Sequence, residues 1–330
     1  MSSVHDDEGP SLKTSGKSIL FAADWGAFAP VIFFGSLIVV FGVLEPQVFL
    51  SEDNFRSILN NGAILAMLAC GLTIVLAVGE FDLSIAAAAS FGGALAAVLV
   101  ARAEVPLPFV VLAVIAAGLT IGLVNGYLVS KFDIPALIAT IGVSSLLDGL
   151  TLWVTGNSVI FTGFTSAFMA IGGWRLLNIQ APVFYLLIVS ILLFLMMRYT
   201  ASGRYIYASG GNRAASRMSG IRVERQVILA FLIAGLLGAL AGLIYVSRQG
   251  SLTPLFGASL LLPTFAAVFL GSVTLARRRF HIVGTVIGVY LIQTGTTGLL
   301  IMGAPAYTQQ LFAGAVLILA SIGAKFRTKK

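Results

Sequence analysis

The sequence predicts an all-α polytopic membrane protein with about ten transmembrane helices. Of its 330 residues, 58% are hydrophobic and 10% are Asp, Glu, Lys or Arg, whereas soluble domains have about 45–50% apolar and about 25% charged residues. The apolar residues form long runs, and a helix needs roughly 20 of them to cross a hydrocarbon core about 30 Å thick. Such runs exclude a transmembrane barrel, in whose strands polar and apolar residues alternate.

Ten apolar runs, bounded by charged residues, prolines or glycine clusters, each predict one helix. In chain order the predicted helices are 27–44, 55–78, 82–102, 107–130, 135–154, 181–198, 226–246, 257–275, 281–302 and 307–323. We expect a polar N-terminal tail at 1–26, a single transmembrane domain at 27–324 and a basic C-terminus at 325–330.

The basic residues predict the orientation of the helices. With ten spans both termini lie on one side of the membrane, and all but four of the 20 Lys and Arg residues fall on that side. The four exceptions are Arg56, Arg102, Arg175 and Arg248. Because basic residues concentrate in cytoplasmic loops, we expect both termini to be cytoplasmic. The net charge of +7 therefore fits a membrane protein and not a nucleic-acid partner.

Glycines spaced four residues apart predict close packing between helices. Gly118, Gly122 and Gly126 share one helix face, and Gly238 and Gly242 repeat the spacing. Small residues at this interval let helix backbones approach in lipid. We expect a role in packing for these glycines.

Two carboxylates interrupt the apolar pattern in the sequence GEFDLS, between the second and third predicted helices. Glu80 and Asp82 lie there with almost no loop around them. A charge inside the membrane costs about 2.5–3.5 kcal/mol on insertion scales, so it usually faces water or a partner. Asp82 or Ser84 could cap the helix that follows. The segment is either a tight turn at the cytoplasmic surface or a broken helix beside a translocation path.

Uncharged polar residues also lie within the predicted helices. Their amides and hydroxyls can bind a passing polyol, and they can equally hold helices together. The candidate translocation path comprises Glu80, Asp82, Ser84, Asn125, Thr140 and Gln293.

No catalytic or metal-binding arrangement stands out in the sequence. The two histidines, His5 and His281, are far apart, and Cys70 is the single cysteine. Neither a metal cluster nor a nucleophile–base pair is therefore expected. We expect no catalytic residue, no metal and no cofactor in this chain.

Residues 203–226, GRYIYASGGNRAASRMSGIRVERQ, carry five arginines between two long apolar runs. Asn212 is a good helix N-cap, Ala214 and Ala215 favour helix, and Gly220 suits the C-terminal end of a helix. The pattern predicts a short helix within the loop at about 199–226. It is either a docking element for a partner protein or a basic loop attracted to anionic membrane lipid.

This segment resembles the cytoplasmic coupling loop of permease subunits from bacterial ABC importers of the ribose, xylose and arabinose type. The family pattern GGN-x-AA-x-x-SGI reads GGNRAASRMSGI here, with Arg213 in place of the usual acidic residue. GEFDLS is similar to the family's GGIDLS, with Glu80 where a glycine is usual. Further similar segments lie at 125–142 and 269–285. In the second of these, Ala276 and Arg277 replace a glycine pair.

The resemblance implies a dimer of permeases, a second copy or a related chain, with a fold like that of vitamin B12-type importer permeases. It implies an ATP-binding cassette subunit that carries ATP and Mg, and a periplasmic or extracellular sugar-binding protein. The residues implied to couple the permease to the ATPase are Asn212, Arg213, Ala214, Ala215, Arg217 and Gly220. The implied function is import of a monosaccharide or related polyol across the bacterial inner membrane by alternating access.

Two other hypotheses remain open on the sequence. One is a proton-coupled secondary transporter of a small polar solute, in which Glu80, Asp82 or Asp148 would titrate. The other is a passive channel. The sequence does not identify the sugar.

Overall fold

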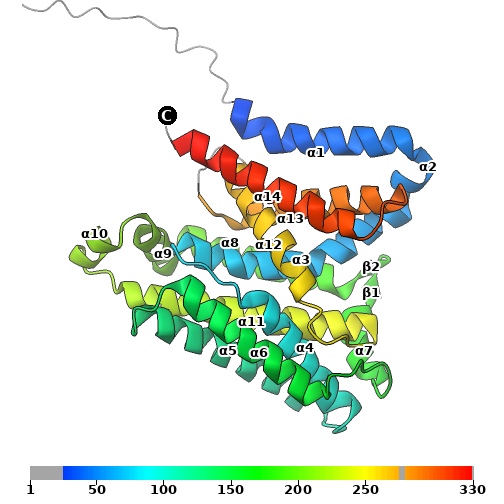
Figure 1. Cartoon of the computed structure of the whole chain (residues 1–330), viewed down its shortest axis with the longest axis horizontal. Helices are drawn as coiled ribbons and strands as arrows, with labels where there is room; N and C mark the ends of the chain where they lie inside the picture. The colour runs from blue at the N-terminus through cyan, green and yellow to red at the C-terminus, as the bar shows by residue number, and fades with distance from the viewer. Residues whose placement is uncertain (1–24, 275–278, 329–330) are drawn as a thin grey trace, which may run out of the picture.

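The computed structural model describes residues 25–274 and 279–328, which fold mainly into helices (Figure 1). The helices are α1 (Trp25–Leu44), α2 (Pro46–Phe49), α3 (Glu52–Ala77), α4 (Ile85–Ala101), α5 (Leu107–Ser130), α6 (Ala136–Thr155), α7 (Ser166–Gly173), α8 (Ala181–Tyr199), α9 (Ala201–Gly211), α10 (Arg213–Met218), α11 (Val223–Gln249), α12 (Ala258–Val273), α13 (Ile282–Ile301) and α14 (Tyr307–Thr328). Most of the predicted tail and the substitutions at Ala276 and Arg277 lie outside the described residues.

Each of the ten predicted ranges coincides with a helix, and the predicted ends are within a few residues of the observed ones. Within the described residues, six helices are long and apolar enough to cross a membrane: α3, α5, α6, α8, α11 and α13. In α1, α4, α12 and α14 the apolar stretches found within the described residues are 10–17 residues long. The chain is thus a helical, multi-pass membrane protein.

The structure differs from the prediction at the ends of several helices. α3 begins at Glu52, three residues early, because Ser51 caps it and accepts a hydrogen bond from Asn54 N at 3.1 Å. α14 continues to Thr328, so part of the predicted C-terminal segment is helical. Both helix ends contain charged residues, so a prediction based on apolar runs does not include them.

One segment for which no helix was predicted contains short elements. The segment between α6 and α8 holds α7 and a hairpin of β1 (Arg175–Leu176) and β2 (Ile179–Gln180). Its two turn residues, Leu177 and Asn178, have φ of 53° and 62°, as a type I′ turn requires. The all-α prediction misses this hairpin because its strands are too short to show a pattern.

The glycines at four-residue intervals lie at close helix contacts: those of α5 pack against α11, and Gly238 and Gly242 of α11 pack against α4. An added Cβ on Gly118 would lie 2.8 Å from the carbonyl oxygen of Gly235, and one on Gly126 would lie 2.8 Å from Cα of Ile228. A Cβ on Gly122 would collide with the carbonyl oxygen of Phe231. The packing role predicted for these glycines is confirmed.

The helices form two groups that share α3 (Figure 1). One group contains α4, α5, α6 and α11, and the other contains α12, α13 and α14. α3 packs against α11 in the first group and against α12 and α13 in the second. The Thr73 and Thr285 hydroxyls hydrogen-bond at 2.6 Å and join α3 to α13 inside the core.

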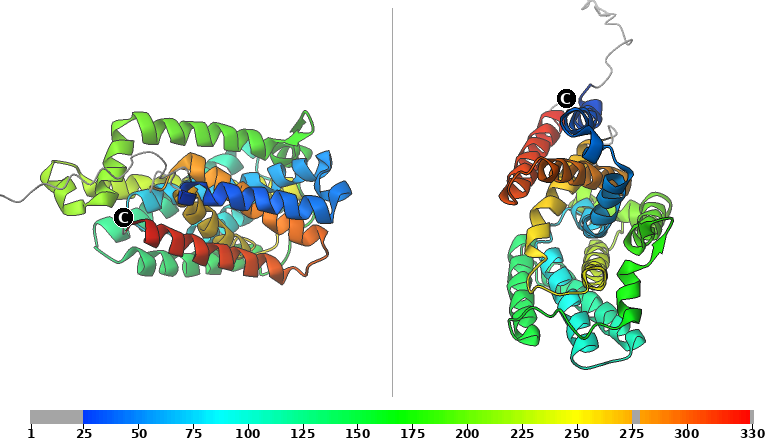
Figure 2. Two further views of the ribbon diagram at one scale, coloured as in Figure 1. Left: turned by 90° about the horizontal axis from the view of Figure 1, so that it is seen from above. Right: turned by 90° about the vertical axis from the view of Figure 1, so that its right-hand side faces the viewer.

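The two ends of the bundle differ in what they carry. α9, α10 and the last turns of α14 lie toward one end, whereas α2, α7 and the β1–β2 hairpin lie at the other (Figures 1 and 2). α1 begins on the α10 side and runs toward α2. The start of α1 and the end of α14 therefore lie on the same side of the bundle.

Candidate functional site

The α9–α10 segment (residues 201–218) projects from one end of the bundle (Figure 1). Thr200 caps α9 and accepts a hydrogen bond from Gly203 N at 3.3 Å. The predicted loop at 199–226 is mostly helical. Its glycines lie within α9 or just after α10, so they do not break these helices. Sequence reasoning missed α9, whose eleven residues include three glycines.

The short helix predicted around Ala214 and Ala215 is confirmed as α10. The Asn212 side-chain oxygen accepts a hydrogen bond from Ala215 N at 3.0 Å, as an N-cap does. Gly220 follows the helix with φ of +81°, a conformation that favours glycine. Ala214, Ala215 and Arg217 are exposed, so α10 offers one face to a partner.

The junction between α3 and α4 (residues 78–84) is a turn in which buried and exposed residues alternate. Gly79, with φ of +88°, ends α3: its N–H donates to Leu76 O at 3.1 Å, and Glu80 N donates to Val75 O at 3.0 Å. These two bonds are a Schellman motif, which closes a helix. Glu80 and Asp82 are only 8% and 1% exposed. The two carboxylates therefore point into the fold, whereas Gly79 and Phe81 of the same turn are exposed.

Four of the predicted path residues meet at this junction. Ser84 donates to Asp82 Oδ1 from both its N–H, at 2.8 Å, and its hydroxyl, at 2.6 Å. Asn125 Nδ2 of α5 donates to Ser84 Oγ at 2.7 Å. Leu83 N donates to Thr140 Oγ1 of α6 at 3.1 Å. The network joins the start of α4 to α5 and α6, which is the helix-joining alternative for these polar groups.

The capping predicted for the start of α4 holds in part. Asp82 binds the N–H of Ser84, the residue just before the helix, whereas the Ser84 side chain makes no capping hydrogen bond. The Ser84 hydroxyl is engaged by Asp82 and Asn125 instead.

Glu80 forms an ion pair with Arg213, the first residue of α10. The side chain of Glu80 is 10% exposed and that of Arg213 is 41% exposed. Sequence reasoning assigned the two residues to different roles and missed their contact. The available signal was that both depart from the family pattern, one by gaining an acid and the other by losing one.

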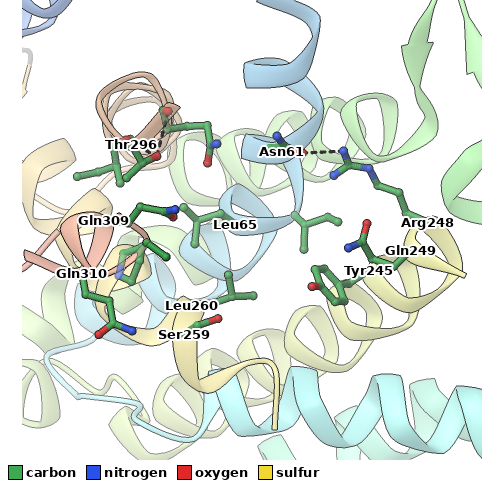
Figure 3. Close-up of a pocket in the computed structure, with 15 residues that line it drawn as sticks. Asn61, Leu65, Tyr245, Arg248, Gln249, Ser259, Leu260, Thr296, Gln309 and Gln310 are labelled. Atoms are coloured by element: carbon green, nitrogen blue, oxygen red, sulfur yellow. Dashed lines mark hydrogen bonds between the residues drawn. The ribbon is translucent and has the colours of Figure 1, made fainter. Parts of the chain in front are cut away.

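A polar pocket of about 420 Å³ lies between α3, α11, α12, α13 and α14 (Figure 3). Its polar lining consists of the amides of Asn61, Gln249, Gln293, Gln309 and Gln310, the hydroxyls of Tyr245, Ser259 and Thr296, and the guanidinium of Arg248. The described lining residues include no Asp or Glu. Because α11 runs from the α10 end to Gln249, this pocket lies toward the opposite end of the bundle.

The side chains around this pocket leave several hydrogen-bonding groups available. Arg248 donates to Asn61 Oδ1 at 2.6 Å on one side, and Gln309 and Gln310 lie on the other (Figure 3). Within the described part of the chain, the side chains of Gln249, Gln309 and Gln310 make no hydrogen bond. These neutral amides suit a ligand that carries hydroxyl groups.

An aromatic wall completes the pocket. The Tyr245 ring stacks on Phe256 with centroids 4.2 Å apart and planes at 6°. Of the six predicted path residues only Gln293 lines this pocket. Its side-chain Nε2 donates to Thr297 Oγ1 at 3.2 Å. This leaves the side-chain oxygen Oε1 as an acceptor.

Among residues 25–274 and 279–328, no three His, Cys, Asp or Glu side chains gather as metal ligands would. His281 instead caps α13, where its Nδ1 accepts a hydrogen bond from Gly284 N at 2.8 Å. Cys70 is fully buried in α3. The described site is thus one of hydrogen bonds and ion pairs.

Comparison with known proteins identifies the family. The model of a family described as "Branched-chain amino acid transport system / permease component" matches residues 54–321, which include the pocket, the junction and α10. The chain belongs to this permease family. The resemblance stated from GGNRAASRMSGI and GEFDLS is confirmed.

The permease is similar to several curated import permeases. It is 38% identical to the ribose import permease protein RbsC of Escherichia coli K12, over 86% of this chain and 89% of that protein. It is 34% identical to RbsC of Bacillus subtilis, over 94% of this chain and 96% of that protein. It is 30% identical to the autoinducer 2 import system permease protein LsrC of Salmonella typhi, over 86% of this chain and 80% of that protein.

Proposed function

We propose that this chain is the membrane-spanning subunit of an ATP-driven importer that carries a monosaccharide or related polyol across the bacterial inner membrane. The observation that carries the proposal is similarity over nearly the whole chain to import permeases for ribose. The pocket agrees with it, since its amides and the Tyr245 ring suit a hydroxyl-rich cargo. The similarity to LsrC extends the cargo class to other small polar molecules.

The proposed topology has ten spans with both termini in the cytoplasm, in a fold like that of vitamin B12-type importer permeases. The apolar helices α1, α4, α12 and α14 supply the four spans beyond α3, α5, α6, α8, α11 and α13. The outer ends of α1 and α14 lie on the α10 side (Figure 2), and the arginine-rich segment lies there too. The positive-inside rule then places α10 in the cytoplasm.

The permease needs an outside source of energy in this proposal. An ATP-binding cassette subunit binds ATP and Mg and contacts the exposed face of α10, including Ala214, Ala215 and Arg217. ATP closes a pair of these subunits and moves α10. Two permeases, identical or related, form the translocation unit, and this chain itself is no enzyme.

The cargo enters in this mechanism from the end opposite α10. A sugar-binding protein docks there and delivers the sugar to the polar pocket, which the amides and Tyr245 line. Alternating access then requires that movement of α10 reaches the pocket through the helices between them.

Removal of α10 tests the proposal. We expect deletion of 212–220, or Arg217→Glu, to abolish ATP-driven sugar uptake in proteoliposomes that contain the permease, the ATPase and the binding protein. Arg217 is exposed and Arg217→Glu leaves the Glu80–Arg213 ion pair in place, so this variant should still purify as a folded protein. Unchanged uptake after the deletion contradicts coupling through α10. Uptake by this chain alone, driven by a pH gradient without ATP, supports a secondary transporter instead.

A further inference from the structure

The Glu80–Arg213 ion pair connects the segment proposed to receive force with the middle of the fold. Arg213 is the first residue of α10, and Glu80 lies directly after the end of α3. The two residues are 133 positions apart in the sequence. The apolar pattern that forms the helices does not depend on either charge, so we look for a role of the ion pair itself.

The backbone around the pair is packed closely enough to pass on a displacement. Gly210, in the last turn of α9, lies so near α3 that an added Cβ would collide with the carbonyl oxygen of Ala77. A Cβ on Gly79 would lie 3.2 Å from Cα of Gly210. The end of α9 therefore rests on the end of α3, and the ion pair lies beside this contact.

The backbone leads from Glu80 into a hydrogen-bond network that joins two further helices. Two residues beyond it, Asp82 accepts both hydrogen bonds of Ser84. Asn125 of α5 and Thr140 of α6 bind the same turn. A displacement of Glu80 therefore moves a turn that buried hydrogen bonds hold to α5 and α6.

The second ion pair of α10, between Arg217 and Glu224, differs from the Glu80–Arg213 pair in its exposure and in the helix that it reaches. Arg217 lies 2.9 Å from Glu224, but the two side chains are 55% and 32% exposed. Glu224 belongs to the first turn of α11. Exposed pairs contribute little because water screens them, whereas a nearly buried carboxylate depends strongly on its partner.

We propose that the Glu80–Arg213 ion pair transmits the movement of α10 to the α3–α4 junction, which makes Glu80 a coupling residue of the transport cycle. The inference rests on the proposed ATP-driven function. It assigns Arg213 a role toward the interior of the permease, in addition to any contact of α10 with the ATPase. Glu80 acts through Arg213 and the junction and touches no cargo.

The test measures sugar taken up per ATP hydrolysed in proteoliposomes with the ATPase and a saturating amount of binding protein. The variants are Glu80→Gln, Arg213→Gln and the exchange Glu80→Arg with Arg213→Glu. Glu224→Gln is the matched control, because it removes the acid from the exposed ion pair of α10. Co-purification of the ATPase verifies that each variant folds and assembles.

We expect each single variant to lower the uptake-to-hydrolysis ratio about tenfold while ATP hydrolysis continues, since coupling between sites is typically about 5- to 150-fold. The exchange should recover most of the ratio, and Glu224→Gln should change it less than about twofold. A purely structural role would lower uptake and hydrolysis together. If Glu80→Gln does not assemble, Arg213→Gln, whose side chain is partly exposed, provides the comparison with the exchange.

Two results overturn the inference. One is a wild-type ratio in the single variants, and the other is an exchange that performs no better than the single variants. Failure of the proposed function is distinguishable, because there the wild-type complex itself would take up sugar without ATP or would hydrolyse ATP without uptake.

Discussion

Single amides decide what the polar pocket can bind. Gln293 projects from the middle of α13 and keeps its carbonyl oxygen available, while Gln309 and Gln310 reach in from the start of α14. A sugar hydroxyl can both donate and accept, so it can use either end of an amide. The absence of Asp and Glu from the described lining favours a neutral cargo over a cationic one.

Loss of the Gln293 amide should therefore weaken transport. We expect Gln293→Leu to lower the uptake rate at subsaturating sugar by about three- to tenfold, because a net hydrogen bond contributes about 0.5–1.5 kcal/mol. Radiolabelled sugar uptake in proteoliposomes measures this effect. Gln47→Leu is the matched control, since Gln47 is exposed on α2 and outside the pocket. Equal uptake by the two variants would contradict a cargo role for Gln293.

At the scale of elements, α10 depends on its ends because it has only six residues. So short a helix has no stability of its own. Asn212 satisfies one N–H at its start, and Gly220 provides the left-handed conformation after its end. Together with its contacts to α9 and α11, these ends keep α10 folded.

We expect Asn212→Ala to unfold α10 locally, since loss of an N-cap costs about 1 kcal/mol. Hydrogen–deuterium exchange should then be faster at residues 213–218 and unchanged in α3. Ser51→Ala serves as the control, because it removes the same kind of cap from a 26-residue helix. Slow exchange at 213–218 in the Asn212 variant would show that the cap is dispensable.

The elements themselves were largely predictable from sequence. Apolar runs located the ten long helices, and Asn212 and Gly220 located α10, because these signals are local. The β1–β2 hairpin and α9 were missed, since short or glycine-containing segments carry no periodic signal. The start of α3 was missed because its first turn is charged.

The candidate site was less predictable, because it depends on which helices become neighbours. Sequence reasoning selected Asp82, Ser84, Asn125 and Thr140, and the structure brings them into one network. It included Gln293 and not the other amides of the pocket, which come from three further helices. The contact between Glu80 and Arg213 follows only from the packing of α9 on the end of α3.

At the scale of the whole molecule, the orientation in the membrane can be tested with single cysteines. The native Cys70 is fully buried, so it adds little background. We expect Ser219→Cys, beside α10, to react with a membrane-impermeant maleimide only from the cytoplasmic side. Thr162→Cys, in the segment after α6, should react only from outside. The reverse pattern, or labelling of both from one side, would refute the proposed topology.

α3 is the element that both helix groups share, and it lies beside both the pocket and the junction. At about 1.5 Å per residue, its 26 residues form a rod that reaches from the pocket to the junction. Asn61, in the first half of α3, holds Arg248 at the pocket, and Glu80, just past the end of α3, holds Arg213. A tilt of this single helix would therefore move the pocket and the contact with α10 at the same time.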